Sequence, residues 1–207
     1  HGTYEANNAM HDCDLMINIG ARFDDRITGK IDEFSPKSKK IHIDIDPSSI
    51  NKNVKVDLAL VGDVKLVLEK LVSVVKQKHP DFENSNKQKI AAWWNQIENW
   101  RKKNSLGYIN SKEVIKPQFA VQRLYELTKA QDVFITTEVG QHQMWEAQHY
   151  KFDKPNRWMT SGGLGTMGYG LPAAVGVQVA NPDKLVIDIA GEASVLMTMQ
   201  EMSTAVQ

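Results

Sequence analysis

The sequence predicts an α/β fold, with parallel sheets flanked by helices and parts of two domains in one chain. Short runs rich in β-branched residues alternate with amphipathic helical stretches, which is the pattern of a parallel sheet. Apolar residues make up 42% of the 207 residues, enough for buried cores. A polar, lysine-rich stretch divides this pattern in two. We therefore expect one domain at 1–75, a helical linker at 76–116 and a second domain at 117–207.

The first region is expected to contain three strands and a helix. The strands are Leu15–Ile19, Lys40–Ile45 and Val54–Val61, and the helix is Val64–Val75. In the linker we expect a helix from Asn86 to Lys103, whose apolar residues recur at helical spacing. These residues are Ile90, Trp93, Trp94, Ile97 and Trp100. A tryptophan stripe can stack a ligand, but we interpret this one as a packing surface between domains.

The second region alternates in the same way. The expected elements are a helix from Pro117 to Lys129, a strand from Val133 to Thr136, a helix from Gly140 to His149, a glycine-rich loop from Ser161 to Gly170, a helix that Pro172 opens and Asn181-Pro182 closes, a strand from Leu185 to Ile189 and a helix that starts near Ser194. This order again predicts a parallel sheet.

Composition excludes several classes of partner. Twenty-five basic residues balance twenty-five acidic ones, so we expect no nucleic-acid partner. No apolar run approaches the roughly 20 residues that cross a bilayer, so we expect no membrane span. The single cysteine, Cys13, cannot form an internal disulfide, which suits a reducing compartment.

The chain opens at His1 without a methionine and stops inside an expected helix, so we expect a piece of a longer protein.

Polar, glycine-bearing segments follow the three strands of the first region. In parallel sheets, ligands bind beyond the carboxyl ends of the strands. The segment from Gly20 to Arg26 contains two arginines whose guanidinium groups can bind phosphate. The carboxylates of Asp44-Ile45-Asp46 can accept hydrogen bonds from ribose hydroxyls. At Gly62-Asp63, backbone amides at a helix start can bind a nucleotide group. Each also has a structural explanation, as a surface salt bridge or a helix N-cap. Together they favour a dinucleotide site, although the G-x-G-x-x-G pattern is absent.

Three segments of the second region could form a diphosphate and metal site. Gly140 to Trp145 lies at a helix start, where free amides can meet an anion. Ser161 to Gly170 holds five glycines, which either let the backbone approach a ligand or form a generic flexible loop. Gly191-Glu-Ala-Ser194 places a carboxylate where Mg²⁺ could bridge it to phosphate, although a first-turn acid is the simpler explanation for Glu192.

Read in order, these segments resemble the acetolactate synthase family of thiamine-diphosphate enzymes. Gly20 to Gly29 and Ile41 to Asp46 are similar to its FAD-binding central domain. Gly140 to Trp145, Ser161-Gly-Gly-Leu-Gly-Thr-Met-Gly-Tyr-Gly170 and Gly191-Glu-Ala-Ser194 are similar to its thiamine-diphosphate-binding domain. The resemblance is collinear and spans the whole chain. It implies that 1–75 is the C-terminal part of the FAD domain and 117–207 the N-terminal part of the thiamine domain.

The resemblance also implies which residues contact each cofactor. Those expected to line FAD are His1, Gly2, Gly20, Arg22, Asp24, Asp44, Ile45, Gly62, Asp63 and Val64. Those expected at thiamine diphosphate are Gln141 and His142 on the diphosphate, Gly165 and Met167 on the aminopyrimidine side, and Ala193 and Ser194 beside Glu192, the expected Mg²⁺ ligand. Met167 would wedge the cofactor into a bent shape. The flavin would have a mainly architectural role.

This sequence departs from the family pattern in the metal motif. The family has an aspartate where this chain has Glu192, and Mg²⁺ tolerates misplaced ligands poorly. A second metal ligand, an asparagine, would lie beyond Gln207. The glutamate that activates the thiamine ring belongs to an amino-terminal domain outside this chain. We therefore expect no catalytic residue here and no activity from the chain alone.

For the full-length protein, the resemblance implies decarboxylative condensation of pyruvate with a second 2-oxo acid, in branched-chain amino acid biosynthesis. The alternatives are a noncatalytic FAD- or nucleotide-binding module and another thiamine-diphosphate enzyme such as pyruvate oxidase. The resemblance further implies a homodimer or homotetramer with a small regulatory subunit. The location would be cytoplasmic in a bacterium, and plastid or mitochondrial in a eukaryote.

Overall fold

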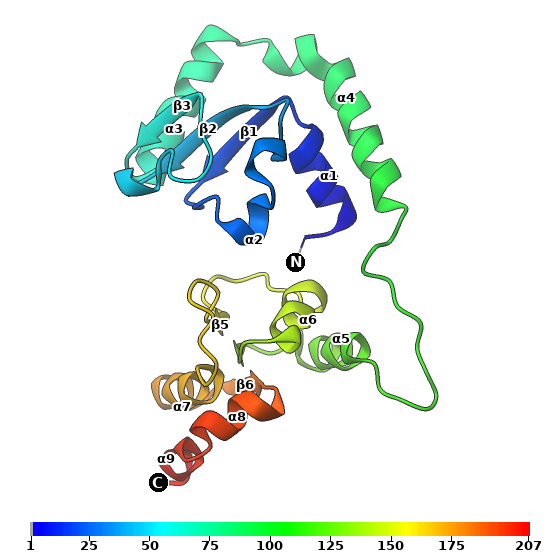
Figure 1. Cartoon of the computed structure of the whole chain (residues 1–207), viewed down its shortest axis with the longest axis vertical. Helices are drawn as coiled ribbons and strands as arrows, with labels where there is room; N and C mark the ends of the chain where they lie inside the picture. Colours follow the sequence, from blue (N-terminus) through cyan, green and yellow to red (C-terminus); the bar gives the residue numbers. More distant parts are fainter. Residues whose placement is uncertain (1) are drawn as a thin grey trace. The chain divides into compact units, whose positions relative to one another are not determined.

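The computed structural model describes residues 2–207, and these form two compact units, Gly2–Ser105 and Leu106–Gln207. Each unit contains a three-stranded parallel sheet with helices against it (Figure 1). The predicted α/β class with parallel sheets is therefore confirmed. No helix within residues 2–207 is long and apolar enough to cross a membrane.

The first unit is built on a sheet with the strand order β1-β2-β3. Its elements are α1 (Tyr4–Asp12), β1 (Leu15–Ile19), α2 (Asp25–Thr28), the 3-10 helix η1 (Ile31–Glu33), β2 (Lys39–Asp44), the 3-10 helix η2 (Pro47–Ser49), β3 (Leu58–Val61), α3 (Val64–Lys78) and α4 (Phe82–Arg101). Ile17 pairs with Ile41, and Ile41 with Leu58, so all three strands run in one direction. Their carboxyl ends therefore share one edge.

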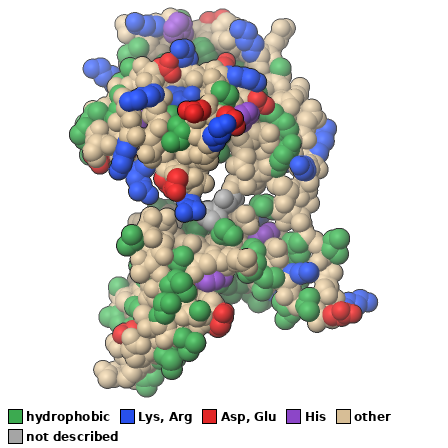
Figure 2. All heavy atoms as spheres, in the orientation of Figure 1, with side chains coloured by type: hydrophobic (Ala, Val, Ile, Leu, Met, Phe, Trp, Pro, Cys, Tyr) green, Lys and Arg blue, Asp and Glu red, His purple; other side chains and the backbone are tan. Residues whose placement is uncertain are grey.

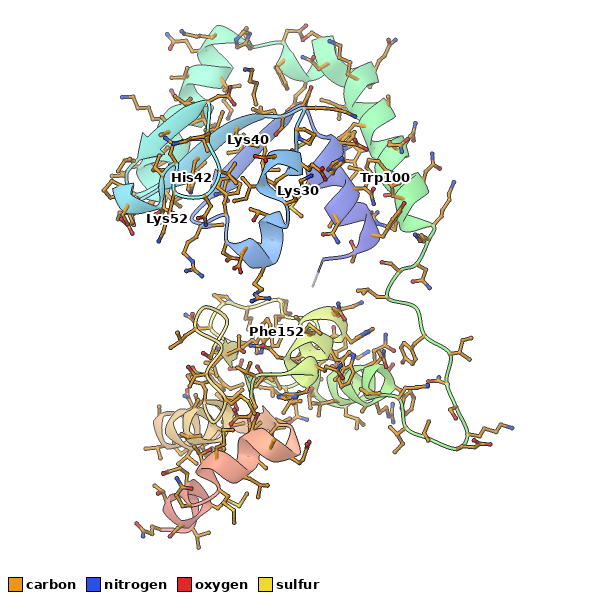
Figure 3. The ribbon with its side chains drawn as sticks, viewed as in Figure 1. Lys30, Lys40, His42, Lys52, Trp100 and Phe152 are labelled. Carbon is orange, nitrogen blue, oxygen red and sulfur yellow. The ribbon has the colours of Figure 1, made fainter. Side chains whose placement is uncertain are left out.

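The central strand β2 carries polar residues into the interior of this unit. Lys40 and His42 are both buried on β2 (Figure 3). The Lys40 ammonium donates to the carbonyls of Ser35 (2.8 Å) and Ser38 (3.2 Å). Ile43, between them and the strand end, is fully buried. The loop that follows η1 is thus fixed to β2 by a buried, hydrogen-bonded lysine rather than by apolar packing alone.

Helix α4 packs along α1 within the first unit (Figure 1). Trp93 and Trp100 meet edge to face, with ring centroids 5.7 Å apart, whereas Trp94 is 54% exposed. The helix begins at Phe82, four residues before the expected start. The Asp81 carbonyl accepts from Ser85 N–H and its carboxylate accepts from the Asn84 side-chain amide, but the carboxylate does not cap the helix backbone.

Charges of both signs cover the first unit. On the face seen in Figure 2, Lys and Arg side chains are interspersed with Asp and Glu over the part built from residues 2–105. Residues 2–105 contain 17 Lys and Arg and 15 Asp and Glu side chains.

The second unit has the strand order β5-β4-β6, with β4 in the centre. Its elements are α5 (Pro117–Thr128), β4 (Val133–Thr137), α6 (Gln141–His149), β5 (Trp158–Thr160), α7 (Gly170–Ala180), β6 (Leu185–Ile189), α8 (Glu192–Thr198) and α9 (Glu201–Val206). All five residues of β4 are buried. The core joins Val121, Val133, Ile135 and Tyr150. Burial on both faces accords with the apolar run Val133–Ile135 and with the absence of charged residues from this strand.

One carboxylate lies at the start of all three strands of this sheet. Asp132, Arg157 and Lys184 immediately precede β4, β5 and β6. Asp132 accepts from Arg157 Nε at 2.9 Å and pairs with Lys184 Nζ at 3.2 Å and Lys154 Nζ at 3.3 Å. The hydrogen bond from Arg157, followed by that from Lys184, holds the pKa of the Asp132 carboxyl well below its usual range.

Six elements were not expected from the sequence, and one strand is shorter than expected. The unexpected elements are α1, α2, η1, η2, β5 and α9. The prediction of a strand over Val54–Val61 is wrong for its first half, because β3 starts only at Leu58. Val54 is apolar and buried but lies in a loop, which Asn51 closes by accepting from Val56 N–H. Val54 is therefore apolar because it is buried in a loop, and the sequence pattern did not distinguish this from the start of a strand.

Candidate functional sites

In the first unit, the loops after β1, β2 and β3 meet at one edge of the sheet. Gly20 N–H donates to the Ile43 carbonyl at 2.9 Å, and Gly62 N–H donates to the Asp44 carbonyl at 3.0 Å. Gly20 has φ +64° and open space where a side chain would be. The three strand ends that the sequence singled out are thus brought together, with room beside the first.

The loop that carries Arg22 is fixed by two polar side chains of the sheet, the partly buried Asn18 and the fully buried His42. The Ala21 carbonyl accepts from Asn18 Nδ2 at 2.6 Å and from His42 Nε2 at 2.9 Å. Phe23 is buried with φ +51°, a conformation that few residues other than glycine adopt. Arg22 itself is 61% exposed. The loop therefore presents its guanidinium at the sheet edge on a fixed backbone.

Several expected FAD residues also have structural roles. Asp24 caps α2 by accepting from Arg26 N–H and pairs with Arg22 at 3.6 Å. Asp63 caps α3 by accepting from the N–H groups of Lys65 and Leu66. The structural explanations given for these two acids thus hold, whether or not they also meet a ligand.

The remaining FAD candidates differ in their surroundings. Asp44 is buried and accepts from Asp46 N–H at 2.9 Å, while the neighbouring Ile45 side chain is 71% exposed. Val64 is the first residue of α3. Gly2 precedes α1 and lies against the Asn7 side chain. His1 lies outside the described residues.

In the second unit, the three candidate loops also leave one sheet edge. Glu138 N–H donates to the Ile189 carbonyl at 3.1 Å, which joins the ends of β4 and β6. Gln143 Nε2 donates to Thr160 Oγ1 at 2.6 Å, which ties α6 to the end of β5. Ser194 Oγ donates to the Val139 carbonyl at 3.5 Å. The segments around Gln141, Gly165 and Glu192 therefore all start from this edge.

His142 fits between two glycines. A Cβ at Gly140 would lie 2.7 Å from the imidazole Cε1, and one at Gly191 would lie 3.0 Å from it. Burial lowers the pKa of His142, and the nearby Glu138 and Glu192 oppose this. Its Nε2 is buried without a hydrogen-bond partner among the described residues. A buried ring nitrogen without a partner fits a bound polar ligand.

The glycine-rich loop has a defined shape. Gly165 and Gly168 have φ +73° and +85°. Ser161 Oγ accepts from Thr166 N–H at 2.9 Å and closes the turn. Met167, between the two glycines, is 40% exposed. The loop thus has a defined turn, with a partly exposed thioether side chain between two glycines of positive φ.

Glu192 is the first residue of α8 and is exposed, with Ala193 next to it. Within residues 2–207, no group of three or more His, Cys, Asp or Glu side chains is placed to hold a metal ion. A single carboxylate still fits Mg²⁺, which commonly takes its other ligands from phosphate oxygens and water. Ser194 is buried and bonded to the main chain, so its hydroxyl positions α8.

The sequence reasoning missed a group of buried acids behind these loops. Thr136 Oγ1 donates to Asp188 Oδ1 at 2.8 Å, and burial raises the pKa of Asp188 to about 6. Glu138 is also fully buried. Glu146, on α6, is fully buried with both carboxylate oxygens lacking partners among the described residues, and burial raises its pKa to about 8. The available signal was Asp188, an acidic residue inside the apolar strand Leu185–Ile189.

Comparison with known proteins defines the class. Residues 1–71 match the family model "Thiamine pyrophosphate enzyme, central domain", and residues 138–207 match "Thiamine pyrophosphate enzyme, C-terminal TPP binding domain". The chain belongs to the thiamine pyrophosphate enzymes, with parts of two of their domains. The expected thiamine-diphosphate-binding domain is therefore confirmed.

Within that class, the whole chain is similar to acetolactate synthase large subunits. It is 47% identical over 209 residues to the isozyme 3 large subunit of Escherichia coli (strain K12), covering 100% of this chain and 35% of that protein. It is 46% identical over 207 residues to the large subunit of Haemophilus influenzae and 48% over 210 residues to that of Buchnera aphidicola subsp. Acyrthosiphon pisum, with the same coverage. The predicted resemblance is confirmed. The chain spans about a third of the length of these relatives.

Proposed function

We propose that this chain supplies part of the thiamine-diphosphate site and part of an FAD site of an acetolactate synthase. The full-length protein would condense pyruvate, with loss of CO₂, with a second 2-oxo acid. The observation that carries this proposal is the meeting of three loops at the carboxyl edge of β5-β4-β6, around a His142 nitrogen that lacks a partner. The names of the relatives favour this reaction over that of pyruvate oxidase.

Each loop would have a separate task at the thiamine site. When bound, thiamine diphosphate supplies the nucleophilic carbon that the reaction needs. Gln141 and His142 would bind the diphosphate, together with the free amides at the start of α6. Gly165 would let the backbone approach the aminopyrimidine, and Met167 would press against the cofactor. Glu192 would hold Mg²⁺ through its carboxylate, with Ala193 and Ser194 beside it.

The first unit would hold FAD at the edge formed by its three strand ends. Arg22 would pair with the diphosphate, because its guanidinium is exposed on a fixed loop. Asp44 and the amides near Gly62 would meet the ribose and the remaining polar groups. Gly2, Gly20, Asp24, Ile45, Asp63 and Val64 would complete the lining, as would His1. The flavin would stabilise the fold rather than exchange electrons.

The decisive experiment uses the full-length protein with its natural flanks. We expect acetolactate from pyruvate only when thiamine diphosphate and Mg²⁺ are added. Activity with Glu192 or with Glu192→Asp supports the enzyme, whereas activity with neither supports a noncatalytic FAD- or nucleotide-binding module. Oxygen-dependent flavin turnover would instead indicate a pyruvate oxidase. The 207-residue chain alone should form no acetolactate.

The relatives also suggest an assembly. They are named large subunits, which accords with a homodimer or homotetramer and a small regulatory subunit. Sedimentation of the full-length protein, alone and with a candidate small subunit, tests both. We propose a cytoplasmic location in a bacterium and an organelle location, plastid or mitochondrion, in a eukaryote.

A further inference from the structure

Glu138 joins two of the loops of the candidate thiamine site, although it was not among the expected site residues. It follows β4 directly, and its side chain is fully buried. Its N–H donates to the Ile189 carbonyl at 3.1 Å, so its backbone is fixed to the end of β6. A buried glutamate at this place needs hydrogen-bond partners, and it has them.

The carboxylate of Glu138 holds the end of the glycine-rich loop. Oε2 accepts from Gly168 N–H at 2.7 Å, and Oε1 accepts from Leu171 N–H at 3.2 Å. Leu171 lies in the first turn of α7, where amides lack partners within the helix and negative charge is favourable. Both oxygens are therefore engaged with the backbone segment that immediately follows Met167.

Glu138 is itself part of the other loop. It lies between β4 and α6, four residues before His142, and its N–H is bonded to the end of β6. Its side chain is bonded to the Gly168–Leu171 segment. Movement of the glycine-rich loop against the loop that leads to His142 would therefore break these carboxylate bonds.

We propose that Glu138 is a positioning residue, which fixes the loop of Met167 relative to His142 so that both meet one cofactor molecule. The role of Glu138 in catalysis rests on the proposed function, in which the cofactor bound at this site is thiamine diphosphate. The two oxygens of the glutamate accept from the two amides. Glutamine would turn an NH₂ group towards an N–H donor, whereas aspartate keeps the charge but is one methylene shorter.

The first test is amide hydrogen exchange in this chain. In Glu138→Gln, the amides of Gly168 and Leu171 should exchange about ten-fold faster than in the unsubstituted chain, while the interior of β4 stays protected. Glu113→Gln is the matched control, because Glu113 is exposed and its side chain has no role in either loop. Unchanged exchange at Gly168 and Leu171 would overturn the anchoring role.

The second test uses the full-length protein. Glu138→Gln should raise the KM for thiamine diphosphate about ten-fold and lower kcat, at temperatures well below unfolding. Glu138→Asp, which keeps the charge, should recover part of the loss and serves if the glutamine variant does not fold. A residue that only stabilises the fold would lower Tm without changing this KM, and that outcome would overturn the positioning role.

The two proposals fail in different ways. If unsubstituted full-length protein binds no thiamine diphosphate, the proposed function fails and the catalytic meaning of Glu138 falls with it. The exchange rates of the Gly168 and Leu171 amides then still test whether the Glu138 carboxylate holds the Gly168–Leu171 segment. If the protein binds the cofactor equally well with Glu138→Gln, only the inference about Glu138 is wrong.

Discussion

Gly170 and Asp188 are so close that no side chain fits between them. A Cβ at Gly170 would lie 2.5 Å from Asp188 Oδ1 and 2.7 Å from the backbone nitrogen of Glu138. Thr136 holds the Asp188 carboxyl by a hydrogen bond of 2.8 Å, so the carboxyl cannot simply turn away. The start of α7 is thereby packed directly onto the ends of β4 and β6.

Gly170→Ala should therefore destabilise the second unit, by about 1–3 kcal/mol, because a methyl group is forced against backbone and a bonded carboxyl. Gly176→Ala is the matched control in the same helix, since a Cβ there meets nothing within 4 Å. It should stabilise by about 0.5–1 kcal/mol. Urea denaturation measures both, and equal effects of the two substitutions would contradict the packing argument.

Glu146 should make the second unit less stable as pH rises. Burial raises the pKa of Glu146 from 4.5 to about 8. Between these values the folded protein retains a proton that the unfolded chain releases. Its contribution to stability is therefore fully present below about pH 4.5 and falls as pH approaches 8, by at most about 1.4 kcal/mol per pH unit.

Glu146→Gln removes this titration at nearly constant volume. The variant should match the unsubstituted chain near about pH 5 and exceed it in stability near about pH 8. Burial also lowers the pKa of the neighbouring His149, but that effect is common to both proteins and cancels in the difference. Glu126→Gln, at an exposed glutamate on α5, is the control. A difference in stability between the variant and the unsubstituted chain that does not change with pH would contradict this prediction.

The tryptophans of α4 should differ in their contribution to the stability of the first unit. Trp93 packs edge to face on Trp100, whereas Trp94 is more than half exposed. Trp93→Ala should cost about 1–2 kcal/mol, from the lost aromatic pair and lost burial. Trp94→Ala should change stability by no more than about 0.5 kcal/mol. Thermal unfolding followed by circular dichroism compares them.

FAD affinity should depend on Arg22 far more than on Arg26. Arg22 lies on the loop fixed by His42, while Arg26 is almost fully exposed and, within residues 2–207, pairs with Asp25 alone. Arg22→Gln in the full-length protein should weaken FAD binding about ten-fold or more, because a charge-assisted hydrogen bond is lost. Arg26→Gln should leave it nearly unchanged. Flavin fluorescence titration measures both, and the reverse order would count against the proposed site.

The alternation of short apolar runs with helical stretches was sufficient to predict the fold class. It did not predict burial, because β4 is buried along its whole length whereas β1 exposes every second residue. The bounds expected for Leu15–Ile19 and Leu185–Ile189 are confirmed. Helix α1 was missed, and it is held by the Thr3 cap and by packing on α4. Local patterns do not record such tertiary support.

The candidate sites were predictable to the level of loops. Strand ends indicate where ligands bind, so the segments around Arg22 and His142 followed from the sequence. Glu138 did not, since an acid directly after a strand normally faces water. Its burial depends on Gly168 and Leu171, which lie thirty or more residues further along the chain. The individual cofactor contacts stay predictions.

Asp132 has a consequence for how the sheet of the second unit can be assembled. It contacts Arg157 and Lys184, the residues directly before β5 and β6, and itself directly precedes β4. A slip of any strand by one residue would separate these charges and turn its buried side chains to the opposite face. The ion pairs of Asp132 thus favour the native strand register over shifted registers. They lie at the amino ends of the strands, opposite the cofactor loops.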